Sequence, residues 1–130
     1  MADAQQALKD RIDAIEEAYE FMLGYAAQGH AAEPGGPGGV RDYLERLARA
    51  LDGLENAAAA LAPDGNAAWS GFLEVVARDV EKARAVTRFV LAQESIGSQT
   101  VDNLNASLHL RALLTDLFLL DEATGGSDDE

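Results

Sequence analysis

Polar side chains that can bind metals or transfer protons gather on one face of the segment 100–123. Asp102, Asn105, His109 and Asp116 fall within about 60° of one another on a helical wheel with roughly 3.6 residues per turn. A carboxylate or amide one or two turns from a histidine can orient its imidazole ring or share a metal ion with it. The pattern predicts a polar binding site on this helix, and a solvated polar stripe is the simpler alternative.

Residues from other segments would extend this polar site. Glu94 falls on the apolar seam of the preceding predicted helix, where a carboxylate must be paired, protonated or placed at a wet helix end. If the two helices form a hairpin, Glu94 would approach Asp102. Up-down connectivity would bring His30, Glu33 and Arg41 to the same end. The predicted ligand or metal site comprises Glu94, Asp102, Asn105, His109 and His30.

The chain lacks the motifs that would make this chemistry specific. It contains neither the Glu-x-x-His of di-iron helical bundles nor a His-Glu-x-x-His zinc motif. The glycines at 35–39 are not followed by the Lys-Ser/Thr of a phosphate-binding loop, and no cysteine is present. We therefore expect a protein that is not an enzyme and carries no cofactor. An enzyme using Glu94 as general base with His109 is the remaining alternative.

A second cluster is acidic and lies near the N-terminus. Asp13, Glu16, Glu17 and Glu20 fall on the helical face opposite the apolar seam of their segment, without basic partners on that face. Such a patch can receive a basic surface of another protein, or Arg and Lys side chains of another helix. A solvated acidic face is the alternative, and a metal site is disfavoured because no loop converges these carboxylates.

Four stretches of apolar residues at steps of three and four supply the elements that would position these side chains. Breakers separate them: Gly29, the Pro/Gly-rich segment that follows it, the turn at Pro63–Asn66, and Gly97. Each amphipathic helix must bury one face, which predicts an all-α four-helix bundle, mostly antiparallel, in a single domain over 1–123. The expected helices are 4–28, 40–62, 67–95 and 100–123, followed by a disordered acidic tail at 124–130.

The apolar residues of the last two predicted helices cover more of the wheel than one bundle core requires. Exposed apolar patches of this kind mark interfaces, and a two-fold dimer is the commonest closed form. The interface is therefore expected to include Val86, Phe89, Leu113, Leu117 and Leu120. A wider monomer core is the alternative.

Composition narrows the class of partner. The chain has 130 residues and a net charge of -13, so nucleic acids and anionic membranes should be repelled. Its start has no secretory signal and no apolar run long enough to cross a membrane, which favours a cytoplasmic protein. Arginine outnumbers lysine, which is typical of a GC-rich bacterial gene. We expect an acidic accessory or adaptor protein that binds another protein, one with a basic surface, through helix faces, as a homodimer. A small-ligand- or metal-binding bundle is the alternative.

Overall fold

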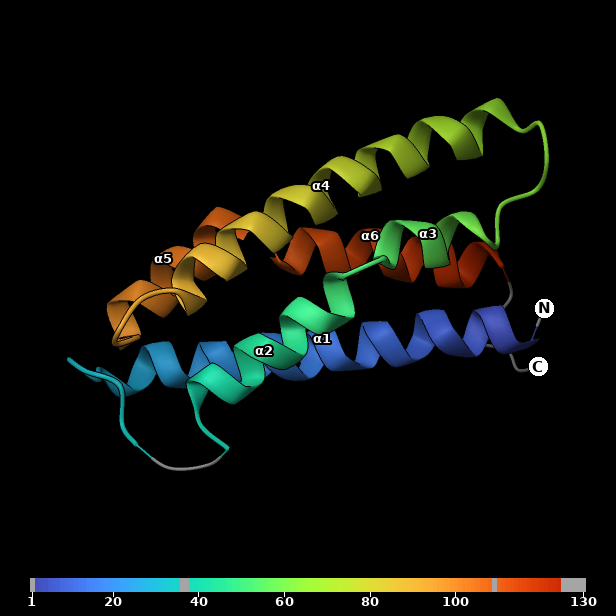
Figure 1. Ribbon diagram of the computed structural model, residues 1–130. Helices are drawn as coiled ribbons and strands as arrows, with labels where there is room; N and C mark the ends of the chain where they lie inside the picture. Colours follow the sequence, from blue (N-terminus) through green and yellow to red (C-terminus); the bar gives the residue numbers. More distant parts are fainter. Residues whose placement is uncertain (1, 36–37, 109, 125–130) are drawn as a thin grey trace.

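The computed structural model describes residues 2–35, 38–108 and 110–124. All regular structure in these ranges is helical, which confirms the predicted all-α class. The described residues form six helices where four were expected (Figure 1). They are α1 (Ala2–Gln28), α2 (Val40–Leu51), α3 (Leu54–Ala59), α4 (Ala67–Leu91), α5 (Ser98–Leu108) and α6 (Leu110–Ala123).

The second predicted helix is interrupted at Asp52 and Gly53. Gly53 adopts a φ of 78°, a left-handed conformation that residues with a side chain rarely take. The interruption frees carbonyl groups at the end of α2, and the Arg11 guanidinium on α1 donates to those of Ala50 (3.0 Å) and Asp52 (2.5 Å). The apolar period alone could not reveal this break, because Leu51 and Leu54 stay buried on both sides of it.

The third and fourth predicted helices also have different ends. The turn at Pro63–Asn66 offered Asp64 or Asn66 as the cap of α4, and Asn66 takes this role, with its side-chain oxygen accepting from two backbone N–H groups. However, α4 ends at Leu91 rather than at 95, and the next helix begins at Ser98 rather than at 100. The expected helix 100–123 is described as α5 and α6; residue 109 between them lies outside the described residues, as does the expected tail beyond Thr124.

One hydrophobic core draws side chains from all six helices. Helix α1 contacts α2, α3, α5 and α6, and α4 packs against those same four helices (Figure 1). The largest fully buried side chains include Leu8, Ile15, Met22, Leu44 and Leu117. Each buried aliphatic side chain of this size contributes about 1.5–3 kcal/mol of transfer free energy, so this core holds the helix ends and loops in place.

None of the helices in the described ranges is long and apolar enough to cross a membrane.

Candidate functional sites

Hydrogen bonds between residues far apart in the sequence connect the end of α1 to the start of α5. The Tyr25 hydroxyl donates to the Ile96 carbonyl (2.5 Å), and the Ser98 hydroxyl donates to the Tyr25 carbonyl (2.5 Å). Ser98 also accepts from the His30 N–H (2.7 Å) and donates its own N–H to the His30 carbonyl (2.8 Å). A Cβ at Gly97 would lie 3.0 Å from two carbonyl oxygens of the adjoining segment, so a glycine is needed where the two backbones meet.

Glu33 and Arg41 form an ion pair at the same end of the molecule, which we call the Glu33–Arg41 clamp. The guanidinium donates to both carboxylate oxygens (2.9 and 3.2 Å). It also donates to the carbonyls of Leu91 (2.6 Å) and Gln93 (2.9 Å), so it caps the C-terminal end of α4. Glu33 in turn accepts from the N–H of Ile96 (3.1 Å). The clamp therefore joins the segment from Glu33 to Arg41 to residues 91–96, which are distant from it in sequence.

Electrostatics at the clamp follow from these bonds. The hydrogen bond from Arg41 lowers the pKa of the Glu33 carboxyl, with a further contribution from the Ile96 N–H and against the effect of burial. The same hydrogen bond raises the pKa of Arg41. Burial, and secondly the charge of Glu33, raise the pKa of the Tyr25 hydroxyl. Both members of the clamp are thus held in their charged forms, and Tyr25 stays neutral as a hydrogen-bond donor.

The structure brings together two of the five predicted ligand residues. His30 and Asp102 line an open cleft of about 590 Å³ beside Ser98 and the half-exposed Leu23. The His30 ring lies against Tyr25, with ring centroids 4.9 Å apart, and its Nε2 is 2.7 Å from the side-chain oxygen of Gln28. The imidazole is therefore held at the cleft by neighbours on its own segment.

The other predicted ligand residues do not join this cleft. Glu94 is exposed rather than seated on a core seam, because α4 ends three residues before it. Asn105 is half-buried elsewhere on α5, and His109 lies outside the described residues. Within the described ranges, no group of three or more potential ligands is placed to hold a metal ion.

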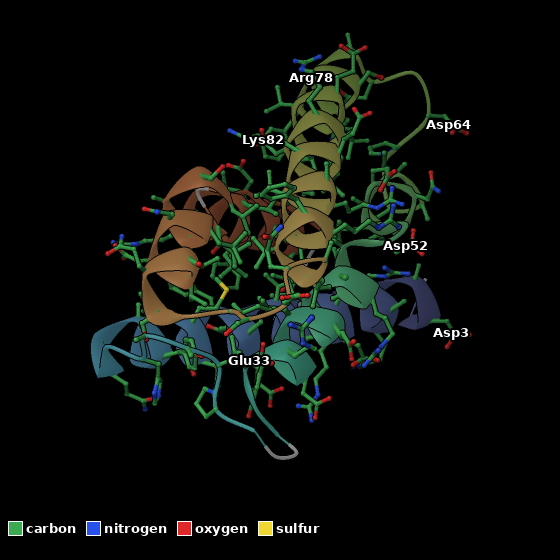
Figure 2. All side chains as sticks on the ribbon, turned by 60° about the vertical axis from the view of Figure 1, so that its left-hand side comes forward. Asp3, Glu33, Asp52, Asp64, Arg78 and Lys82 are labelled. Atoms are coloured by element: carbon green, nitrogen blue, oxygen red, sulfur yellow. The ribbon has the colours of Figure 1, made fainter. Side chains whose placement is uncertain are left out.

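The acidic face of α1 is mostly exposed, as its sequence pattern predicted for all four carboxylates. Asp13, Glu17 and Glu20 are exposed, whereas Glu16 is half-buried. Neither of the two ion pairs found among the described residues involves this face. Figure 2 shows Arg78 and Lys82 on the part of α4 that is remote from α1, so neither of these cations neutralises it.

The expected interface residues divide between core and surface. Leu113 and Leu117 are buried in the core of the single chain, so their assignment to a dimer interface was wrong. Leu120 is buried as well, but it also lines a surface groove between α4 and α6. The reason for this burial is that α6 packs against both α1 and α4. Two neighbouring helices bury a wider apolar arc of α6 than one neighbour would. Val86 is half-buried, and Phe89 stays 69% exposed.

A different apolar surface lies where the start of α4 meets the end of α6, and we call it the α4–α6 groove. Its volume is about 330 Å³. Leu119 is 54% exposed at the groove, and Val75, one turn after Phe72 on α4, is also exposed. The groove is lined by Ala68, Trp69, Phe72, Leu119, Leu120 and Ala123. The apolar run Phe118-Leu119-Leu120 indicated surplus apolar surface on this segment, but not which helix would border it.

Two carboxylates lie farther along the same pair of helices. Asp116 precedes Leu120 by one turn on α6, and Asp79 follows Phe72 by two turns on α4. Burial, and secondly the charge of Asp79, raise the pKa of the half-buried Asp116. No ion pair among the described residues includes either carboxylate. The two helices that border the groove thus carry two carboxylates beyond it, and Arg111 lines the same shallow surface pocket as Asp116.

Replacing Asp116 by asparagine is expected to stabilise the protein by roughly 0.5 kcal/mol at neutral pH, a small gain because solvent screens the carboxylate. The raised pKa in the fold means that the charge opposes folding above that pKa. This penalty fades as the pH falls through the folded pKa, and it is absent below the ordinary value of 3.8. Urea unfolding at several pH values measures the difference. Asp102→Asn, at an exposed carboxylate, is the control, and a stability gain for Asp116→Asn that does not change with pH would contradict the prediction.

Comparison of the chain with protein-family models, with curated proteins and with solved structures finds no match.

Proposed function

We propose that this protein is a non-enzymatic accessory or adaptor protein that works through helix-face contacts, with the α4–α6 groove as its contact surface. The observation that supports this most directly is the groove itself, whose six lining side chains are all apolar. Apolar side chains that meet across two helices and stay exposed are typical of a protein-binding surface. An amphipathic helix laid into a groove is a common mode of such recognition.

The size of the groove favours a contact with a single helix. A volume of about 330 Å³ holds a few side chains, such as those on one face over two helical turns. Burying an exposed leucine contributes about 1.5–3 kcal/mol, and the half-buried Trp69 and Phe72 would add further area. Trp and Phe also rank among the residues that are enriched at interfaces.

Several finer predictions belong to this proposal. They are the mostly antiparallel four-helix arrangement, in which α2 with α3 and α5 with α6 each act as one helix, and a cytoplasmic location. Self-association as a homodimer belongs here too, but with Leu113 and Leu117 in the core it would have to use the groove, which Leu120 lines. A second copy of the chain and a different protein are thus the two candidate occupants.

A peptide titration tests the proposal. The peptide has leucines on one helical face and glutamines on the other, is about 18 residues long so that it can form a stable helix, and contains no tryptophan. Trp69 is the chain's single tryptophan and lines the groove, so its fluorescence reports on occupancy. We expect a saturable shift of its emission to shorter wavelength as the groove is covered.

Two variants identify the surface that binds. Leu119→Asp places a charge in the groove and should abolish the shift, whereas Phe89→Asp changes an even more exposed apolar residue outside it and should not. Circular dichroism checks that both variants fold. A Trp69 emission that no peptide changes, in a chain that sedimentation shows to be monomeric at every concentration, would contradict the proposal.

Binding of a small molecule at the His30–Asp102 cleft is the second candidate function. It is favoured because His30 and Asp102 line the cleft together with apolar residues such as Leu23 and Ala26. Native mass spectrometry of freshly purified protein would show extra mass that His30→Ala loses. A wild-type protein that carries no extra mass would count against this candidate.

A further inference from the structure

We infer that the α4–α6 groove receives a basic amphipathic helix of another protein, whose apolar face fills the groove and whose Lys or Arg lies beside Asp79 and Asp116. This inference rests on the proposed function, since it names the occupant of the same surface. Three arguments support it: the carboxylates beyond the end of the groove, the charge around the groove, and the poorer fit of the other candidate occupants.

The end of the groove supplies the first argument. Asp116 is half-buried on α6, and the Asp79 charge on α4 acts on it from the facing helix. A partly desolvated carboxylate beside a second one gains from a cation more than a fully solvated carboxylate does. Neither belongs to an ion pair among the described residues. An incoming Lys or Arg, one or two turns from an apolar anchor, would supply a positive charge to these carboxylates in addition to that of Arg111, which lines the same surface pocket as Asp116.

The charge around the groove supplies the second argument. In the sequence, Asp121 and Glu122 fall between the lining residues Leu120 and Ala123 of α6, and Glu74 follows the lining residue Phe72 of α4 by two positions. Arg78 and Lys82 are exposed on α4, on the part of this helix that is remote from α1 (Figure 2). The whole chain carries a net charge of -13, so its field attracts basic partners and steers them toward it.

The other candidate occupants fit this chemistry less well. A second copy would bring another net charge of -13, together with its own Asp79 and Asp116, to a contact that holds only a few apolar side chains. The segment 125–130, Gly-Gly-Ser-Asp-Asp-Glu, has no apolar side chain to fill the groove and would add carboxylates to its acidic end. A basic helix is the occupant for which both the apolar and the charged contacts are favourable.

The test compares three synthetic peptides with the same leucine face. Their polar face carries lysine, glutamine or glutamate, and none contains tryptophan. Each is titrated against the full chain while Trp69 emission is followed. We expect the lysine peptide to bind at least about tenfold more tightly than the glutamate peptide, with the glutamine peptide between them. Added salt should narrow this spread, because it screens exposed charges.

Two variants separate groove binding from general attraction to an acidic protein. Leu119→Asp makes the chain more negative, so binding by charge alone would be kept or strengthened, whereas docking in the groove is lost. Asp116→Asn should lower the affinity for the lysine peptide by about threefold, because it removes one partly screened charge contact. The affinity for the glutamine peptide should stay the same. Asp102→Asn removes the same charge outside the groove and should change neither peptide.

The outcomes distinguish this inference from the proposed function. Equal affinity for the three peptides, or lysine-peptide binding that Leu119→Asp does not reduce, overturns the basic-helix inference. A concentration-dependent dimer that Leu119→Asp dissociates also overturns it, while leaving helix-face contact intact. If the glutamine and lysine peptides both leave Trp69 unchanged and the chain is monomeric, the proposed function fails together with the inference.

Discussion

Replacing Leu117 by alanine is expected to lower the free energy of unfolding by about 2–5 kcal/mol, because it removes three side-chain carbons from a fully buried position and leaves a cavity. The loss should appear in a dilute sample as well as in a concentrated one, since Leu117 packs inside a single chain. Urea unfolding followed by circular dichroism measures it. For a domain with about 5–15 kcal/mol of total stability, this is one of the most damaging single truncations available.

The neighbouring residue provides a matched control. Phe118 loses more atoms in an alanine substitution but is 44% exposed, so its replacement should cost less than about 1 kcal/mol. Leu117→Asp should leave the chain unfolded, because the charge would have no partner in the core. A Leu117→Asp variant that stays folded as a monomer, while the wild type is a dimer, would show that Leu117 lies in a dimer interface and not in the core.

Replacing Arg41 by alanine is expected to cost about 2 kcal/mol, because it removes the guanidinium that donates to the Glu33 carboxylate and to two carbonyl groups at the end of α4. Solvent reaches part of the pair, with side-chain exposures of 34% for Arg41 and 19% for Glu33, which keeps the cost below that of a fully buried ion pair. Arg41→Lys should recover only part of the loss, since an ammonium group cannot span both the carboxylate and the carbonyls. Denaturant unfolding measures all three proteins.

Arg46, on the exposed side of the same helix, is the control for this substitution. Its guanidinium lies 5.0 Å from the ring centroid of Tyr43, and its replacement by alanine should cost less than about 1 kcal/mol. Equal costs for Arg41→Ala and Arg46→Ala would show that the clamp does not hold the end of α4.

The clamp also predicts how stability depends on pH. Because the folded state lowers the pKa of Glu33 below its ordinary value of 4.5, the ionised carboxyl stabilises the fold fully above that value. This stabilisation is lost as the pH falls through the lowered pKa. Glu33→Gln should therefore be less stable than the wild type at neutral pH, and the gap should close in acid. A gap that persists at the lowest pH would mean that the charge of Glu33 is not its source.

Sequence periodicity determined the helical class and the approximate positions of the helices. Apolar steps of three and four, together with Gly29 and the turn at Pro63–Asn66, depend on local geometry, which one sequence carries in full. The same reasoning placed His30, Glu33 and Arg41 at one end of the molecule, where the clamp is found. It did not predict the interruption at Gly53 or the early end of α4, because both depend on donors that arrive from distant segments, Arg11 and Arg41.

Only the tertiary structure decided which apolar residues are core and which are surface. A helical wheel shows that the segment from Leu110 to Leu120 has a wide apolar arc, but it cannot show that α1 and α4 cover most of that arc. Leu117 is therefore buried while its neighbour Leu119 is exposed at the α4–α6 groove, and the charge of Asp79 on α4 acts on Asp116 on α6, a helix far from it in sequence. Burial depends on how many neighbours surround a position, and that number is set by the packing of whole helices rather than by local sequence.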